Sequence, residues 1–377
     1  MLPAASCQLP ASLNYRMPAE WEPHEATWLT WPKNGTTWPG KLLREVESIY
    51  LQMISALLPG EKVNLLVKDK STAGQILKRL DSKKTGTQNL IFHEVKTVDT
   101  WIRDYGPIFV SQQPAAGSRQ KKNERLQAAS CKLQANRGIA FTKWMFNAWG
   151  GKYSDLARDN GVVNKIKALR GCRRFDVDIV LEGGSIDING RSTLLTTEQC
   201  LLNPNRNPHL SRKQVEQYLK TYLGIKKVIW LKEGIEGDDT DGHVDDITRF
   251  VNSTTVLTAM ESDPNDRNHL ILKENLEILR RSTDQDGKKL KIATLPMPGR
   301  VGPPRSDTDH SRLPASYANF YIGNAAVLTP IYNHKNDKTA LSIIKDFFPQ
   351  RKIVSIECTA LVYGLGSIHC VTQQQPV

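Results

Sequence analysis

The sequence predicts an α/β fold in which five repeats are arranged radially around a central channel. A helix, a strand, a polar loop and one or two further strands recur about five times, at spacings of roughly 50 to 90 residues. Residue identity barely repeats, so the repetition is architectural. Radial repeats enclose a channel on which loops from different repeats converge. An open doubly wound sheet is the alternative, and the paired strands after each crossover count against it.

Helical periodicity of apolar residues is clearest over 41–58, where the pattern stops at Pro59 and Gly60. Helices are expected there and over 71–80, 155–170, 211–223, 265–281 and 337–348, with Ser211 as the N-cap of the fourth. Strands are expected over 63–67, 90–95, 107–111, 175–181, 185–188, 192–196, 227–231, 247–251, 255–259, 290–295, 319–322, 326–329 and 352–356.

The composition supports a large folded domain. Of the 377 residues, 39% are hydrophobic, which is enough for a sizeable core. No apolar run of about 18 residues occurs, so no membrane-spanning helix is expected, and the first residues do not resemble a secretory signal. Six scattered cysteines form neither a disulfide framework nor a CxxC pattern, which favours a cytoplasmic location. We expect an N-terminal tail over 1–16 and one domain over 17–377.

The net charge of +12 is unevenly distributed along the chain. The segment 111–138 carries six basic residues and one acidic residue, so it contributes +5 (6 − 1) of the total. It lacks apolar periodicity and is predicted to be a basic surface insert in contact with solvent. A nucleic-acid-associated protein is the non-enzyme alternative, but the insert lacks the interleaved aromatic residues that bind single strands. Nucleic acid is therefore an unlikely partner.

Two loops place polar side chains next to turn residues. In 99–107, Trp101, Arg103 and Asp104 precede a Gly-Pro turn. By spacing alone, Arg103 and Asp104 could equally form a structural ion pair. In the second loop, Glu182 follows an apolar strand and precedes two glycines, so its carboxylate is expected to point beyond the sheet edge, which is a common functional position.

The densest cluster of ionisable residues is 238–246, with five carboxylates and one histidine. Side chains alternate along an extended segment, so His243 and Asp245 are expected on the same face. Aspartate-rich loops also bind Ca²⁺. The EF-hand spacing and its flanking helices are absent from the sequence, however, so we expect no metal here.

The segment 364–370 contains two glycines, a histidine and Cys370. Glycines allow a tight turn or a close approach to a ligand. A lone cysteine is usually a small buried hydrophobe, whereas a nucleophilic cysteine needs a base and an orienting carboxylate nearby in space. Adjacent residues on an extended chain face opposite ways. His243 is therefore the better candidate for the base, and His369 is expected to be packed or hydrogen-bonded.

Three carboxylates, Asp104, Glu182 and Asp245, would cluster only around a cationic ligand. A guanidinium group is planar, and its fork of N–H donors matches carboxylates bidentately. Together with a thiol and an imidazole, this set predicts displacement at a guanidinium carbon.

Several motifs together resemble those of the agmatine deiminases, and the resemblance runs from about Met17 to the end of the sequence. They occur at 17–24, 101–107, 146–151, 182–185, 202–209, 242–246 and 366–376. The resemblance implies the pentein fold, a five-bladed α/β propeller. It also implies hydrolysis of agmatine to N-carbamoylputrescine and ammonia, a step of putrescine and polyamine biosynthesis, without metal or cofactor.

By this resemblance Cys370 is the nucleophile and His243 the acid and base. Asp104 and Asp245 would hold the guanidinium nitrogens, and Glu182 would assist His243 or the guanidinium. The charge of the substrate, or of His243 as an imidazolium, is expected to lower the pKa of Cys370. Trp101 is our first choice for binding the distant ammonium through its aromatic face.

The alternative enzymes of the same fold are a peptidylarginine and a free-arginine deiminase. The insert at 111–138 departs from the short connection usual in the family, and the loop at 297–313 is expected to shape the entrance of the site. A homodimer is one assembly compatible with the sequence, which does not determine the oligomeric state.

Overall fold

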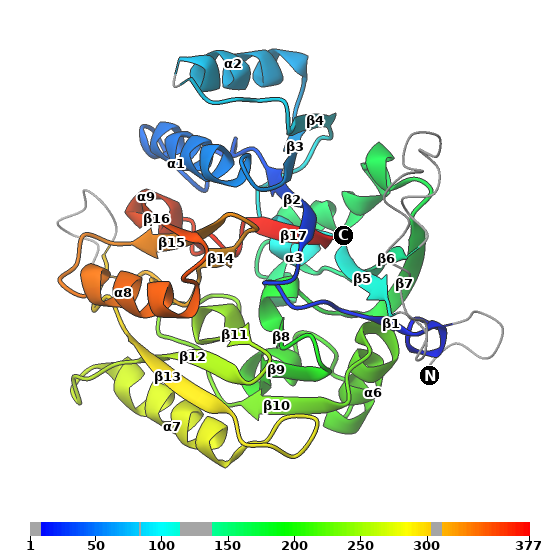
Figure 1. Ribbon diagram of the computed structural model, residues 1–377, viewed down its shortest axis with the longest axis vertical. Coiled ribbons are helices and arrows are strands. Elements are labelled where there is room, and N and C mark those ends of the chain that lie inside the picture. Colours follow the sequence, from blue (N-terminus) through cyan, green and yellow to red (C-terminus); the bar gives the residue numbers. More distant parts are fainter. Residues whose placement is uncertain (1–8, 83, 114–137, 303–310) are drawn as a thin grey trace.

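The computed structural model describes residues 9–82, 84–113, 138–302 and 311–377. In these residues the strands form five sheets that surround the centre of the molecule, with the long helices toward the outside (Figure 1). In each sheet the strand nearest the centre, here called the inner strand, is antiparallel to its neighbour, and that neighbour is parallel to the next strand. The predicted fivefold α/β architecture is confirmed.

The sheets are numbered here in chain order of their inner strands. Each is given from its inner strand outward: first, β5 (Ile108–Gln112), β6 (Ile139–Met145) and β7 (Arg173–Val180), with β1 (Tyr15–Arg16) on the other side of β5; second, β8 (Asp187–Ile188), β9 (Thr193–Thr197) and β10 (Lys227–Leu231); third, β11 (Thr248–Asn252), β12 (Thr255–Met260) and β13 (Lys291–Pro296); fourth, β14 (Tyr321–Ile322), β15 (Ala326–Ile331) and β16 (Lys352–Glu357); fifth, β17 (Thr372–Pro376), β2 (His24–Thr30), β3 (Lys62–Val67) and β4 (Leu90–Glu94).

The helices connect the strands and cover the outer parts of the sheets. The longer ones are α1 (Leu42–Leu57), α2 (Lys70–Asp81), α6 (Arg212–Leu223), α7 (Arg267–Arg281) and α8 (Asp337–Phe347), and the short ones are α3 (Ile102–Tyr105), α4 (Ala148–Gly151), α5 (Glu198–Leu201) and α9 (Thr359–Val362). Ser211 caps α6 in a capping box with Gln214, as its position predicts. Among the described residues, no helix combines the length and apolar character that crossing a bilayer requires.

The helix expected over 155–170 is wrong. The segment forms three short 3-10 helices, Leu156–Gly161, Val163–Lys165 and Lys167–Leu169. Gly161 and the β-branched residues after it weaken an α-helix. In addition, the buried Asp159 carboxylate accepts hydrogen bonds from the backbone N–H groups of Val98 and Asp99. These bonds connect the segment to the start of the loop at 99–107. This long-range bond has no signature in local periodicity.

Four strands were not expected from the sequence, namely β1, β2, β6 and β17. Two of them alter the predicted boundaries of the domain. β1 pairs with β5, so the expected tail over 1–16 ends in a strand of the first sheet. β6 follows the basic insert, and the Gln112 N–H donates to the Gly138 carbonyl at 2.7 Å where the insert meets the sheet. Most of the insert, 114–137, lies outside the described residues.

A network of buried charges joins the sheets behind the centre. Glu20 forms ion pairs with Arg103, Arg249 and His369, which belong to different repeats. Arg249 also pairs with Asp187 at 3.1 Å. Of the two alternatives that spacing left open for Arg103 and Asp104, the ion pair between them does not form, because Arg103 bonds to Glu20 and to the side chain of Gln374 instead. These pairs fix the relative positions of the loops that enter the inner strands.

We predict that Arg249→Ala destabilises the protein by about 3–5 kcal/mol, because it leaves the buried carboxylates of Glu20 and Asp187 without this cation. Urea unfolding followed by circular dichroism measures the change. Arg280→Ala is the matched control, since Arg280 pairs with Glu277 in an exposed position and surface pairs contribute little. Equal unfolding midpoints for wild type and Arg249→Ala would contradict this view of the network.

Candidate active site

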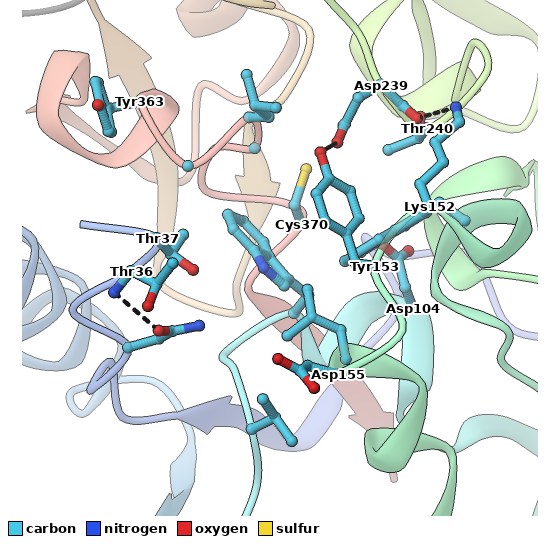
Figure 2. Close-up of a pocket in the computed structure, with 18 of the residues that line it drawn as sticks. Thr36, Thr37, Asp104, Lys152, Tyr153, Asp155, Asp239, Thr240, Tyr363 and Cys370 are labelled. Atoms are coloured by element: carbon cyan, nitrogen blue, oxygen red, sulfur yellow. Dashed lines mark hydrogen bonds between the residues drawn. The ribbon is translucent and has the colours of Figure 1, made fainter. Parts of the chain in front are cut away.

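The four loops selected from the sequence all enter an inner strand and meet at the centre. Asp104 precedes β5, Glu182 precedes β8, His243 and Asp245 precede β11, and Cys370 precedes β17. A cavity of about 790 Å³ reaches two of these residues, Asp104 and Cys370. Its lining includes Trp101, Asp104, Trp149, Tyr153, Asp239 and Cys370 (Figure 2).

Cys370 lies in the cavity wall with 7% of its surface exposed. The loop before it bends through Leu365, whose φ of 69° is in the left-handed region. A Cβ atom on Gly366 would lie 2.5 Å from the Trp101 ring and 3.1 Å from the Cys370 Cβ. The glycine is therefore required for close packing of this loop on Trp101, and the sulfur ends in the cavity beside that indole.

Asp104 is held by two hydrogen-bond donors from other segments. The Gly184 N–H donates to its Oδ1 and the Trp149 indole N–H to its Oδ2, both at 3.0 Å. Ala148 and Trp149 reach this position with positive φ values of 56° and 53°, which is strained backbone for residues with side chains. Burial raises the pKa of Asp104 well above its usual range, and the nearby carboxylates of Asp245 and Glu182 raise it further.

His243 faces two carboxylates around a glycine. A Cβ atom on Gly184 would lie 2.6 Å from the His243 Nδ1, and 3.0 Å from both the Asp104 Oδ1 and the Asp245 Oδ2. Only hydrogen fits there. The segment Val244–Asp246 is a 3-10 turn rather than extended chain, so the alternation expected for His243 and Asp245 is wrong, yet both side chains still reach Gly184.

The imidazole of His243 is neutral in the empty site at ordinary pH. Burial lowers the pKa of His243 to about 3, although the charge of Asp245 acts in the opposite direction. Its Nδ1 lies 3.9 Å from the Asp104 Oδ1, and its buried Nε2 has no hydrogen-bond partner among the described residues. A neutral buried imidazole can accept a proton, which is the property required of a general base.

Asp245 has one oxygen bound and one free. Its Oδ2 contacts the His369 Nδ1 at 2.6 Å, and the other ring nitrogen of His369 contacts the Glu20 Oε2 at 2.8 Å. His369 is thus hydrogen-bonded, as expected. Burial acts to raise the pKa of Asp245, but the hydrogen bond and charge of His369 outweigh it and lower that pKa below the usual range. The buried Oδ1 has no partner among the described residues and can accept a donor from a ligand.

Glu182 is completely buried and paired with Arg206, a residue to which the sequence assigned no role. The Arg206 Nε donates to the Glu182 Oε1 at 2.7 Å, and the same guanidinium donates to Asp241 and to the Thr240 carbonyl. The second oxygen, Oε2, has no partner among the described residues. Arg206 lies in the motif at 202–209, so the resemblance located it but did not explain it.

The remaining acids of 238–246 have different positions. Asp238 accepts hydrogen bonds from the backbone of His243 and from Thr240, and Asp241 binds Arg206 and Lys152, so both hold the loop. Asp239 alone of these three lines the cavity, where it accepts a hydrogen bond from the Tyr153 hydroxyl (Figure 2).

Two sets of three side chains each bring potential metal ligands close together. In each set the ligand atoms are within 4.8 Å of one another, and the members are Glu182, Cys200 and His243 in one and Asp245, Asp246 and Cys370 in the other. The first already contains the Arg206 cation as a partner, and the second faces N–H groups of the Asn319 side chain. Each set thus already has N–H donors on some of its ligand atoms, whereas Glu182 Oε2 and Asp245 Oδ1 have no partner among the described residues and can accept N–H groups of an organic cation.

Comparison with known proteins identifies the class. A sequence model of the Porphyromonas-type peptidyl-arginine deiminases matches residues 16–376, and the chain belongs to this family. Among curated relatives, the agmatine deiminase of Pseudomonas aeruginosa is 34% identical and that of Medicago truncatula is 35% identical; the alignments cover 97% of this chain, and 97% and 98% of the relatives.

Solved structures point the same way. The agmatine deiminase of Enterococcus faecalis superposes with a TM-score of 0.82 at 31% identity, covering 98% of this chain and 97% of that one. A cysteine-to-serine variant of the C. jejuni agmatine deiminase with substrate bound gives a TM-score of 0.78 at 29% identity, covering 96% of both chains. The predicted family resemblance is therefore confirmed.

The electrostatics of the empty site predict a thiol that is slow to ionise. Burial raises the pKa of Cys370 well above its usual value of 9.0, and Asp245, Asp246 and Asp104 raise it further. Because the pKa is raised, the thiolate forms only as the pH increases. The rate of alkylation of Cys370 by iodoacetamide, followed by mass spectrometry of its peptide, should therefore still be rising above pH 9.

Asp104→Asn removes one of the acids and should move the rising part of this pH profile to lower pH. Glu277→Gln, which changes an exposed carboxylate on α7, should leave the profile unchanged. An alkylation rate that reached its plateau below pH 7 in the wild-type protein would contradict a raised pKa of Cys370.

Proposed function

We propose that the protein hydrolyses agmatine to N-carbamoylputrescine and ammonia through a covalent amidino-cysteine intermediate. The observation that carries this proposal is the thiol of Cys370 at the base of a cavity, with the buried carboxylates of Asp104 and Asp245 beside it. The agmatine deiminases among the relatives and solved structures support the choice of substrate.

The guanidinium group would bring a positive charge to the buried carboxylates of the site. Asp104 and Asp245 lie on either side of Gly184 and would accept its N–H groups, with the free Asp245 Oδ1 available for one of them. A cation bound between them favours their ionised forms. It also offsets two of the three charges that raise the pKa of Cys370, those of Asp104 and Asp245, so substrate binding promotes formation of the thiolate.

In the first half of the reaction, Cys370 Sγ forms a bond to the guanidinium carbon, and its proton passes to neutral His243. The imidazolium then returns this proton to the departing nitrogen, and the C–N bond breaks to release ammonia. Because His243 enters the cycle neutral, it does not lower the pKa of Cys370 before substrate binds. Glu182, next to His243 with an unpartnered Oε2, would stabilise the imidazolium while it exists.

In the second half, water attacks the amidino carbon of the thioether. His243 removes a proton from this water and gives it to the sulfur as the C–S bond breaks. The products are N-carbamoylputrescine, the restored thiol and one further proton, which the released ammonia takes up to become ammonium. Atoms and protons balance without an oxidant, a metal or a cofactor, and the same imidazole acts as base and acid in both halves.

The other end of the substrate decides between the alternatives. Agmatine carries an ammonium group there, free arginine adds a carboxylate, and a peptide adds backbone on both sides. The outer cavity contains the indoles of Trp101 and Trp149 and the carboxylates of Asp155 and Asp239, together with Lys152 and Arg158. Aromatic faces and carboxylates hold an ammonium group. We retain free-arginine and peptidylarginine deiminases as the alternatives.

We further propose a cytoplasmic location, because the four described cysteines are free thiols and the reaction requires one of them. The segment 111–138 remains a predicted basic surface insert in contact with solvent. A homodimer remains the simplest assembly for such a chain. The loop expected to shape the entrance contributes Leu313 to the cavity lining, while its residues 303–310 lie outside the described part.

The test of the function is the specificity constant kcat/KM for agmatine, free arginine and an arginyl peptide in one buffer, measured by ammonia release. We expect agmatine to exceed arginine by at least ~10³, because a buried carboxylate without a partner costs several kcal/mol. Equal values for agmatine and arginine would refute the recognition of the amine end. A preference for the peptide would assign the protein to the alternative class.

Cys370→Ser should abolish turnover, because a hydroxyl without an activating base of matched strength is a far poorer nucleophile than a thiolate. Rapid quenching of the wild-type protein with agmatine should give a mass increase on the peptide that contains Cys370. Cys172→Ser is the matched control, since Cys172 is another cysteine that is not among the residues lining the cavity; it should retain the adduct. Full activity of Cys370→Ser would exclude the assigned nucleophile.

A further inference from the structure

The fourth sheet also contributes a side chain to the centre, although the sequence assigned it none. The inner strands of the other four sheets are each entered from a loop with a site residue. In the fourth sheet the corresponding residue is Asn319, two positions before β14, just as Cys370 is two positions before β17. The strand expected over 319–322 included Asn319, so its side chain was not considered for the site.

Every polar atom of the Asn319 side chain is used. The His369 backbone N–H donates to its Oδ1 at 2.8 Å. Its Nδ2 donates to the Asp246 Oδ1 at 2.8 Å and lies 3.2 Å from the Cys370 Sγ. A backbone N–H can only donate, so the amide oxygen must face His369, and the amide nitrogen must then face the sulfur.

The sulfur also lies 3.6 Å from the Asn319 Oδ1, a contact in which a neutral thiol donates, but the amide nitrogen is nearer at 3.2 Å, so an ionised sulfur accepts from it. A neutral thiol is a weak acceptor, whereas a thiolate is a strong one, so an N–H group directed at sulfur stabilises the ionised form preferentially. We propose that Asn319 is a catalytic residue, whose amide donates a hydrogen bond to the Cys370 thiolate and is locked in that orientation by the His369 backbone and by Asp246. This inference rests on the proposed role of Cys370 as nucleophile.

The other groups that face the sulfur explain why such a donor is needed. Asp245 Oδ2 lies 3.9 Å from the Cys370 Sγ, Asp246 and Asp104 are close by, and Tyr50 of α1 is also within electrostatic range. All of these groups are acids. Asn319 is neutral, so it stabilises negative charge on sulfur without placing a fixed cation where the guanidinium must bind.

The experiment measures the pH dependence of Cys370 alkylation by iodoacetamide in Asn319→Ala, without any substrate. Loss of a hydrogen bond to a charged group should move the rising part of the profile to higher pH by about one to two units, which is a roughly 10- to 100-fold lower rate at pH 8. Asn319→Asp is the second variant. It keeps the oxygen that accepts from His369 but replaces the donor, and it should shift the profile in the same direction.

The control is Asn275→Ala. Asn275 lies in α7, is equally buried and makes two hydrogen bonds to backbone groups outside that helix. It should leave the profile in place. An unchanged profile in both Asn319 variants would overturn the proposal. So would a decrease by the same factor at every pH, which is what altered access to the thiol would cause. Failure of agmatine turnover in the wild type would refute the proposed function while leaving this measurement interpretable.

Discussion

The centre of this fold is defined by an excess of buried negative charge. Asp104, Asp245 and Asp246 are the charged groups that act most strongly on the thiol of Cys370, and all three are acids. Burying several carboxylates together is costly unless a cation joins them. The pKa values of Asp104 and Asp246 are therefore raised, and the site is most complementary to a ligand that carries positive charge and many N–H donors. The same excess of negative charge would favour binding of a cation and, once the cation is bound, ionisation of the Cys370 thiol.

The two central histidines, His369 and His243, have the same side chain but differ in their hydrogen-bond partners. His369 is flanked by the carboxylates of Asp245 and Glu20, and both of its ring nitrogens are occupied. His243 is equally buried, but it has a free ring nitrogen and a pKa lowered to about 3 by burial. The first histidine links the site to the arginine network behind it, and the second can gain and lose a proton.

Much of the fold was predictable because hydrophobic period and turn residues are local signals. The five repeats, the long helices except the one over 155–170, and the four loops follow from them. The strand β17 was missed because it contains three glutamines, and a polar run does not indicate a buried strand. Its glutamines form hydrogen bonds with partners remote in sequence, including the Pro107 carbonyl and the Trp28 indole.

The same limitation applies to the site. Residues that carry reactive groups, such as His243 and Cys370, were recognisable by type and company. Arg206, Glu20 and Asn319 were not, because their roles depend on contacts that only the folded ring creates, and Asn319 reads locally as the start of a strand. The partner of Arg103 was left open for the same reason, since it is Glu20 rather than its neighbour in sequence.

The pairing of β17 with β2 has a consequence for biosynthesis. The bond between the Trp28 indole and Gln375 joins residues 347 positions apart, and the fifth sheet is completed only by this contact. During translation β2 therefore waits with one edge unpaired until nearly the whole domain has been made. Unpaired edges invite association with other chains. Nascent chains stalled before Cys370 would carry four complete sheets and an open fifth one, and they would lack the proposed nucleophile, so the thiol and the protection of that edge are acquired together.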